Sequence, residues 1–68
     1  MNLELLREIR ISKKVTQTEM GAYLGYKSKS GYCNLETGVA KISTETANKI
    51  AAKLEMTDEQ KLAVFLPG

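Results

Sequence analysis

Hydrophobic residues recur at spacings of three and four along most of the chain, and residues suited to begin or end a helix separate these stretches. In the first stretch, Leu6 and Ile9 share one helical face with Arg10. Asn2 precedes them, and asparagine is a favoured residue at helix starts. We therefore expect a first helix that runs from Asn2 to about Lys13.

A helix start and a helix end lie close together in the following segment. Thr16 and Glu19 form a capping-box pattern, in which each side chain accepts a hydrogen bond from the other residue's backbone amide. A short helix should begin at Gln17 and stop at Gly25, because glycine readily adopts the positive φ that ends a helix. The apolar positions of this helix are Met20, Ala22, Tyr23 and Leu24.

A second short helix is expected after this turn. It should start near Ser28, with Tyr32 and Leu35 three positions apart on its inward face, and Gly38 marks its end. Glycine inside a helix costs about 1 kcal/mol relative to alanine, so Gly21 in the preceding helix implies close approach of this second one. Two short helices joined by a tight turn form a helix-turn-helix, whose second helix can enter the DNA major groove.

The remainder of the chain predicts two further helices. Ser43 can cap a helix whose core-facing stripe comprises Ala47, Ile50, Ala51 and Leu54. Thr57 and Gln60 repeat the capping-box pattern, and the apolar residues between them and the terminal Pro67 and Gly68 include Leu62, Phe65 and Leu66. This last apolar face either completes the core or meets a second copy. The prediction is an all-α, compact bundle of five short helices with a central helix-turn-helix, forming one domain over residues 1–68.

The composition argues against several other classes of protein. Cys33 is the one cysteine and histidine is absent, so neither an internal disulfide nor a metal site is expected. No run of about 18 apolar residues suggests a membrane helix, and no basic start followed by an apolar segment suggests a signal peptide. We therefore expect a cytoplasmic protein without a cofactor, metal or small-molecule ligand.

The distribution of charge is more informative than the net charge of +2. Up to Lys41 the chain carries seven basic and four acidic side chains, whereas the remainder carries three basic and four acidic ones. The positive excess therefore lies in the half that contains the helix-turn-helix. Such a distribution is typical of a surface that meets a nucleic acid.

The outward face of the second short helix carries the candidate residues for reading bases. With Tyr32 and Leu35 inward, the side chains left to face outward are Lys29, Ser30, Cys33 and Asn34. Lysine can donate to guanine, asparagine can pair with adenine through two hydrogen bonds, and serine can contact either base. The alternative is a solvated polar face on an ordinary helical bundle. In the next loop, Lys41 can reach a phosphate or remain solvated.

The order of these residues resembles the phage repressor and Cro-type helix-turn-helix family, also called XRE-like. The residues that carry the resemblance are Gln17, Gly21, Gly25, Tyr32, Leu35 and the sequence Glu36-Thr37-Gly38. The match extends from Leu6 and Arg10 before the motif to Ile50, Ala51 and Leu54 after it. It implies a lambda-repressor-like DNA-binding domain that acts as a sequence-specific transcriptional regulator, by default a repressor.

The resemblance also assigns expected roles to individual residues. The family joins its first helix to its third through an arginine and a glutamate at the positions of Arg10 and Glu36, although from composition alone Arg10 could simply be exposed. Gln17 and Lys41 match positions at which the family approaches the sugar-phosphate backbone. The residues expected to contact DNA are Gln17, Ser28, Lys29, Ser30, Cys33, Asn34 and Lys41. The expected partner is a palindromic double-stranded DNA operator, bound by a homodimer. The two copies are expected to contact each other through the C-terminal helix or the loop before the fourth helix.

The sequence leaves two rival interpretations, an enzyme and a second kind of binding protein. An enzyme is disfavoured because the chain has no histidine and no glycine loop that could cradle a phosphate. Cys33 lacks both a histidine to activate it and a partner cysteine, so it is expected to be a small exposed side chain rather than a nucleophile. An antitoxin-like or phage-encoded protein-interaction module on the same helical fold is the stronger rival, and an exposed groove around Phe65 would favour it.

Overall fold

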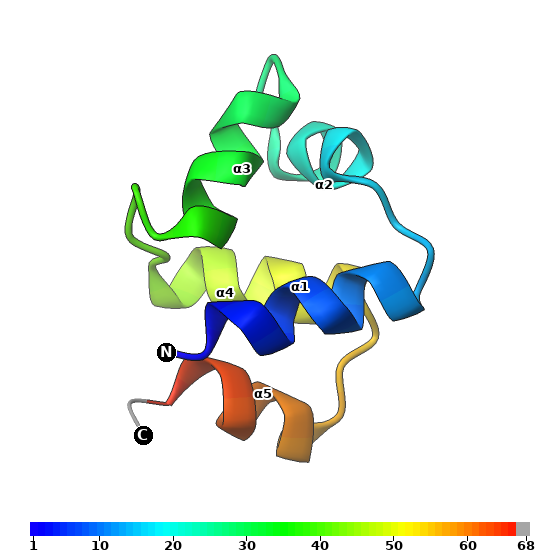
Figure 1. Cartoon of the computed structure of the whole chain (residues 1–68), viewed down its shortest axis with the longest axis vertical. Helices are drawn as coiled ribbons and strands as arrows, with labels where there is room; N and C mark the ends of the chain where they lie inside the picture. The colour runs from blue at the N-terminus through cyan, green and yellow to red at the C-terminus, as the bar shows by residue number, and fades with distance from the viewer. Residues whose placement is uncertain (67–68) are drawn as a thin grey trace.

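Five helices follow one another in the computed structural model, which describes residues 1–66 (Figure 1). They are α1 (Leu3–Ser12), α2 (Gln17–Leu24), α3 (Lys29–Thr37), α4 (Thr44–Lys53) and α5 (Asp58–Phe65). The predicted all-α fold of five short helices is therefore confirmed. Pro67 and Gly68, which were expected to follow the last helix, lie outside the described residues.

Side chains cap four of the five helix starts. Asn2 and Ser43 each accept one backbone amide at the starts of α1 and α4, at 3.0 and 3.2 Å. Both predicted capping boxes are present, with Thr16 accepting from the Glu19 amide at 3.0 Å and Thr57 accepting from the Gln60 amide at 3.1 Å. Each such cap typically contributes about 1 kcal/mol, so local chemistry defines these starts.

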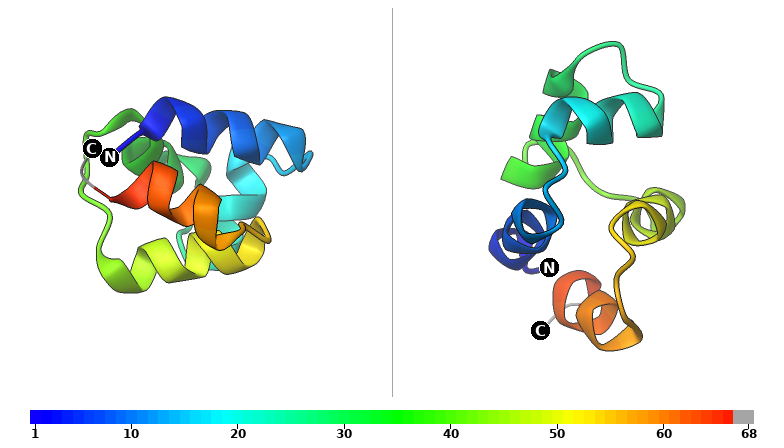
Figure 2. Two further views of the ribbon diagram at one scale, coloured as in Figure 1. Left: turned by 90° about the horizontal axis from the view of Figure 1, so that it is seen from below. Right: turned by 90° about the vertical axis from the view of Figure 1, so that its right-hand side faces the viewer.

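The helices are arranged so that the helix-turn-helix occupies one end of the molecule (Figures 1 and 2). In the right-hand view of Figure 2, α1 and α4 lie beneath α2 and α3, and α5 lies at the opposite end. The two described ends of the chain lie side by side, and the Asn2 amide donates to the Val64 carbonyl at 2.8 Å. The core comprises Leu6, Ile9, Met20, Tyr32, Leu35, Ile50, Ala51, Leu54, Met56 and Val64.

Two helices bury fewer of their apolar residues than the sequence suggests. In α2, Met20 and Gly21 are buried, whereas Ala22 and Tyr23 are exposed, because the two-turn helix packs only one narrow face against α3 and α4. In α5, Val64 completes the core and Phe65 is half-buried. Leu62 and Leu66 remain exposed, so part of the last apolar face is left uncovered. Within residues 1–66, none of the helices has both the length and the apolar character that a membrane crossing requires.

Candidate nucleic-acid interface

The turn between α2 and α3 is built by the backbone of Gly25. Gly25 has φ +89°, the left-handed conformation expected of a helix-ending glycine. Its amide donates to the Ala22 carbonyl at 3.2 Å, and the Tyr26 amide donates to the Gly21 carbonyl at 2.8 Å. These two bonds form a Schellman motif, which satisfies the last carbonyls of α2 and turns the chain toward α3.

Gly21 allows the start of α3 to approach α2 closely. A Cβ atom at this position would lie 3.1 Å from the Ser28 carbonyl oxygen and 3.6 Å from the Lys29 Cα atom. The backbone at the start of α3 therefore leaves room at this position for no more than a tightly fitting methyl group. This confirms the close approach that a glycine inside α2 implies.

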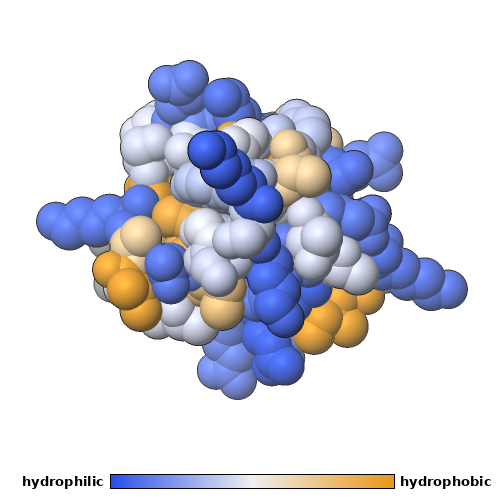
Figure 3. Space-filling view, turned by 90° about the horizontal axis from the view of Figure 1, so that it is seen from above, coloured by the Kyte–Doolittle hydropathy of each residue, from blue (hydrophilic) through white to orange (hydrophobic). Residues whose placement is uncertain are grey.

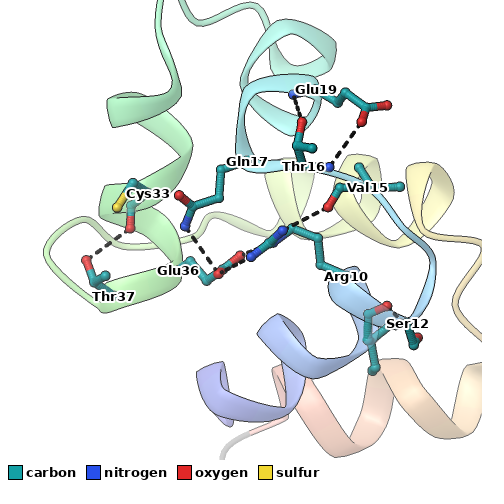
Figure 4. Close-up of polar contacts among 10 residues, drawn as sticks. Arg10, Ser12, Val15, Thr16, Gln17, Glu19, Cys33, Glu36 and Thr37 are labelled. Carbon is teal, nitrogen blue, oxygen red and sulfur yellow. Dashed lines mark hydrogen bonds and ion pairs between the residues drawn. The ribbon is translucent and has the colours of Figure 1, made fainter.

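An ion pair between Arg10 and Glu36 joins α1 to α3 (Figure 4). The Arg10 Nε atom lies 2.9 Å from Oε2 of Glu36, and its Nη2 atom donates to Oε1 at 3.1 Å. A third nitrogen, Nη1, donates to the Val15 carbonyl at 2.8 Å, just before α2. The guanidinium group therefore connects the first helix, the entry to α2 and the end of α3 by bidentate geometry that lysine could not reproduce.

Burial and pairing shift the pKa values within this cluster. The hydrogen bond to Glu36 raises the pKa of Arg10 above its ordinary value and outweighs the opposing effect of burial. Burial alone would raise the pKa of Glu36, but the hydrogen bonds and positive charge supplied by Arg10 outweigh it and lower that pKa. Burial raises the pKa of the Tyr32 hydroxyl, which therefore stays neutral beside the pair. The pair is thus charged over the physiological pH range.

The sequence-predicted contact residues fall into exposed and half-buried groups. The exposed group comprises Ser28, Lys29, Ser30, Asn34 and Lys41. Cys33 is half-buried, and its carbonyl accepts from the Thr37 hydroxyl at 3.0 Å. Gln17 is also half-buried, because its side-chain amide donates to Oε1 of Glu36 at 3.4 Å. Gln17 therefore supports the ion pair through one amide hydrogen while its carbonyl oxygen carries no bond to the described residues.

A groove beside the start of α2 brings Gln17 and Lys29 together. Its lining residues are Arg10, Ile11, Lys14, Val15, Thr16, Gln17, Thr18 and Lys29. Lys41 lies elsewhere, in a groove with Leu3 and Leu35. Lys14 adds a positive charge to the first groove, and sequence reasoning missed it although it stands two residues before the Thr16 cap. The groove therefore combines two lysines with the positive end of the α2 dipole.

The end of the molecule that carries α2 and α3 is largely hydrophilic (Figure 3). Several extended hydrophilic side chains project from this face, residues of intermediate hydropathy lie between them, and hydrophobic atoms lie mainly near its borders. No group of histidine, cysteine and acidic residues within residues 1–66 could hold a metal ion. The chemistry that this face offers is therefore hydrogen bonding and positive charge.

Comparison with known proteins agrees with this geometry. A model of the helix-turn-helix family matches residues 6–62, which include most of α1, all of α2 to α4 and most of α5. Searches of curated proteins and of solved structures found no match. The chain belongs to the helix-turn-helix family of phage repressor and Cro type, whose members are DNA-binding transcription regulators.

Proposed function

We propose that this protein represses transcription by binding a specific double-stranded operator with α3 in the major groove. The observation that supports this most strongly is the two-sided character of α3. Tyr32, Leu35 and Glu36 are buried on its inward side, whereas Lys29, Ser30 and Asn34 are exposed. A helix that is fixed on one side and presents hydrogen-bonding groups on the other is suited to reading base edges.

The exposed side chains of α3 fall into two groups according to their position on the helix. Ser30 and Asn34 lie four residues apart on the side of the helix opposite Tyr32, so they are proposed to read bases. Asparagine can bind adenine through two hydrogen bonds, and serine can contact any of several base edges. Lys29 lies nearer to α2, where it can reach either a guanine or a phosphate. Cys33 borders the reading face from its half-buried position.

Contacts to the sugar-phosphate backbone are proposed at two places. Gln17 lies at the start of α2, where backbone amides and the helix dipole favour a phosphate, and Ser28 lies across the turn. Lys41 is exposed in the loop between α3 and α4. These contacts would position the protein on the duplex without distinguishing one sequence from another.

A homodimer is the proposed binding unit. Met1, Leu62 and Leu66 are 51%, 57% and 55% exposed, and all three line an apolar groove that also includes Ile42 and Phe65. A second copy placed on this groove would remove these side chains from water, at about 25 cal/mol for each Å² buried. Two copies would then present two α3 helices to half-sites about 34–36 Å apart on a palindromic operator.

Selection of bound sequences from random duplexes tests the proposed function. The expected result is an enriched palindromic sequence, bound with a stoichiometry of two chains for each site. Enrichment of one half-site bound by a single chain would refute the homodimer while supporting sequence-specific binding. Failure to enrich any sequence would refute sequence-specific binding itself.

A protein-interaction module of antitoxin type is a second candidate, because the groove around Phe65 is exposed. In that case the groove would hold a different protein instead of a second copy. Light scattering of the isolated protein, with and without a palindromic duplex, separates the two. A monomer in both conditions would favour the second candidate, whereas a dimer on DNA would favour the first.

A further inference from the structure

We propose that Tyr26 is a positioning residue for the reading face, because it holds the first half of α3 against the turn. This inference rests on the proposed function, since the face it positions is the one proposed to read bases. Tyr26 follows Gly25 in the turn, and its backbone amide is fixed by the 2.8 Å bond to the Gly21 carbonyl. The residue is 39% exposed, and the part of its side chain nearest the backbone is covered by α3.

The covered side of Tyr26 lies against Gly31 of α3. A Cβ atom at Gly31 would lie 2.5 Å from Cγ, 2.7 Å from Cδ1 and 2.9 Å from Cβ of Tyr26. All three distances are shorter than non-bonded carbon atoms tolerate. These atoms belong to the base of the side chain, so a small movement of the ring tip cannot relieve the overlap. The Tyr26 side chain therefore packs directly against the backbone of Gly31, in space that a larger residue would occupy.

The first turn of α3 has little other local support. Ser28 occupies the capping position but makes no side-chain cap bond, unlike the capping residues of the other four described helices. The first turn of α3 contains no acidic residue, and Gly31 weakens the helix further. The Tyr26 ring packs where these stabilising features are missing.

The position of Gly31 links this packing to base reading. Gly31 precedes Asn34 by three residues, so the two are neighbours on the helix surface, and Gly31 shares the first turn of α3 with Ser30. A shift of the first turn would displace both side chains. Hydrogen bonds to base edges weaken steeply with poor geometry and carry the sequence information, whereas the proposed phosphate contacts of Gln17 and Lys41 come from outside α3 and carry none. Loss of Tyr26 should therefore reduce discrimination between sequences more than it reduces general affinity.

Binding assays on Tyr26→Ala, Tyr26→Phe and Tyr23→Ala test this inference. Tyr23→Ala is the matched control, because Tyr23 is 47% exposed and its ring faces Lys53 of α4 at 5.6 Å. We expect Tyr26→Ala to lower the ratio of specific to non-specific affinity by about tenfold, a loss comparable to that of one base contact. Tyr26→Phe and Tyr23→Ala should both stay within about twofold of the parent.

Substitution of Gly31 provides a test that does not require DNA. Gly31→Ala should lower the melting temperature of the parent, because the new Cβ overlaps Tyr26. In the Tyr26→Gly background, which removes the Cβ atom of residue 26 together with the ring, Gly31→Ala should instead raise the melting temperature, because alanine is favoured over glycine in a helix by about fivefold in the folding equilibrium. This reversal of sign identifies the contact directly.

The two assays distinguish failure of this inference from failure of the proposed function. If the parent binds DNA selectively but Tyr26→Ala retains the parent's specificity ratio, the positioning role is wrong and the proposed function stands. If Gly31→Ala raises the melting temperature equally in both backgrounds, the Tyr26–Gly31 contact itself is wrong. If the parent shows no sequence preference while the sign reversal is observed, the contact is real and the proposed function fails, and with it the positioning role.

Discussion

Removal of the charge on Glu36 should destabilise the protein more than any comparable change on its surface. Glu36→Gln leaves Arg10 buried and charged without its carboxylate partner. The two side chains are only 10% and 2% exposed. Breaking a fully buried pair costs about 3–5 kcal/mol, and we expect about 3 kcal/mol because Arg10 borders an open groove that water can enter.

The measurable consequence is a large fall in melting temperature. For a domain of this size, 1 kcal/mol corresponds to about 4–8 °C, so the expected fall is at least about 12 °C. Urea unfolding at pH 7 should give the corresponding fall in the free energy of unfolding. The matched control is Glu45→Gln, which removes an exposed pair with Lys49 at 3.7 Å and should change stability by less than about 1 kcal/mol.

Two outcomes would refute this reasoning. If Glu36→Gln melted within about 2 °C of the parent, the ion pair would contribute no net stability compared with a neutral hydrogen-bonded side chain. If Glu45→Gln were equally destabilising, the effect of Glu36→Gln could not be attributed to burial. A double substitution, Arg10→Met with Glu36→Leu, should recover much of the lost stability, because it removes both buried charges together.

Three further results are expected. The difference in free energy of unfolding between the parent and Glu36→Gln should have its full value above about pH 5. It should shrink as the pH falls through the lowered pKa of Glu36, because acid protonates the parent's carboxylate. Urea unfolding between about pH 3 and 7 measures this difference. Lys41→Ala should weaken binding to all duplexes about equally and reduce the salt slope by about one unit, measured by titration at several salt concentrations. Leu62→Ser should weaken dimer formation on DNA in light scattering, whereas Tyr23→Ser, at a position of similar exposure (47%) outside both grooves, should not.

Local chemistry explains why the helix boundaries were predictable. The capping boxes at Thr16 and Thr57 and the glycine ends at Gly25 and Gly38 depend on neighbours within about four residues. These features can be recognised without knowledge of the fold. The Arg10–Glu36 pair joins residues 26 positions apart, and it was expected only because of the family resemblance.

Tertiary packing explains what the sequence did not predict. The hydrophobic residues of α5 do not indicate whether Val64 or Leu62 faces the core, because that depends on how α5 docks beside α1. The role of Gly31 depends on its packing against the Tyr26 ring across the turn. Helix propensity alone predicts only that Gly31 destabilises α3. The approach of Lys14 to the α2 groove similarly depends on the path of the loop after α1. Each of these features arises from contacts between elements.

The effect of Asn34→Ala on sequence preference tests the central claim most directly. Asn34 is exposed on α3, and its substitution leaves the buried Tyr32 and Leu35 unchanged. Selection from random duplexes with the parent and with Asn34→Ala should yield sites that differ at one position of each half-site, with a loss of about 1–3 kcal/mol on the parent's preferred site. If Asn34→Ala stayed folded and retained both the parent's affinity and its sequence preference, the assignment of this face of α3 as the reading face would be contradicted.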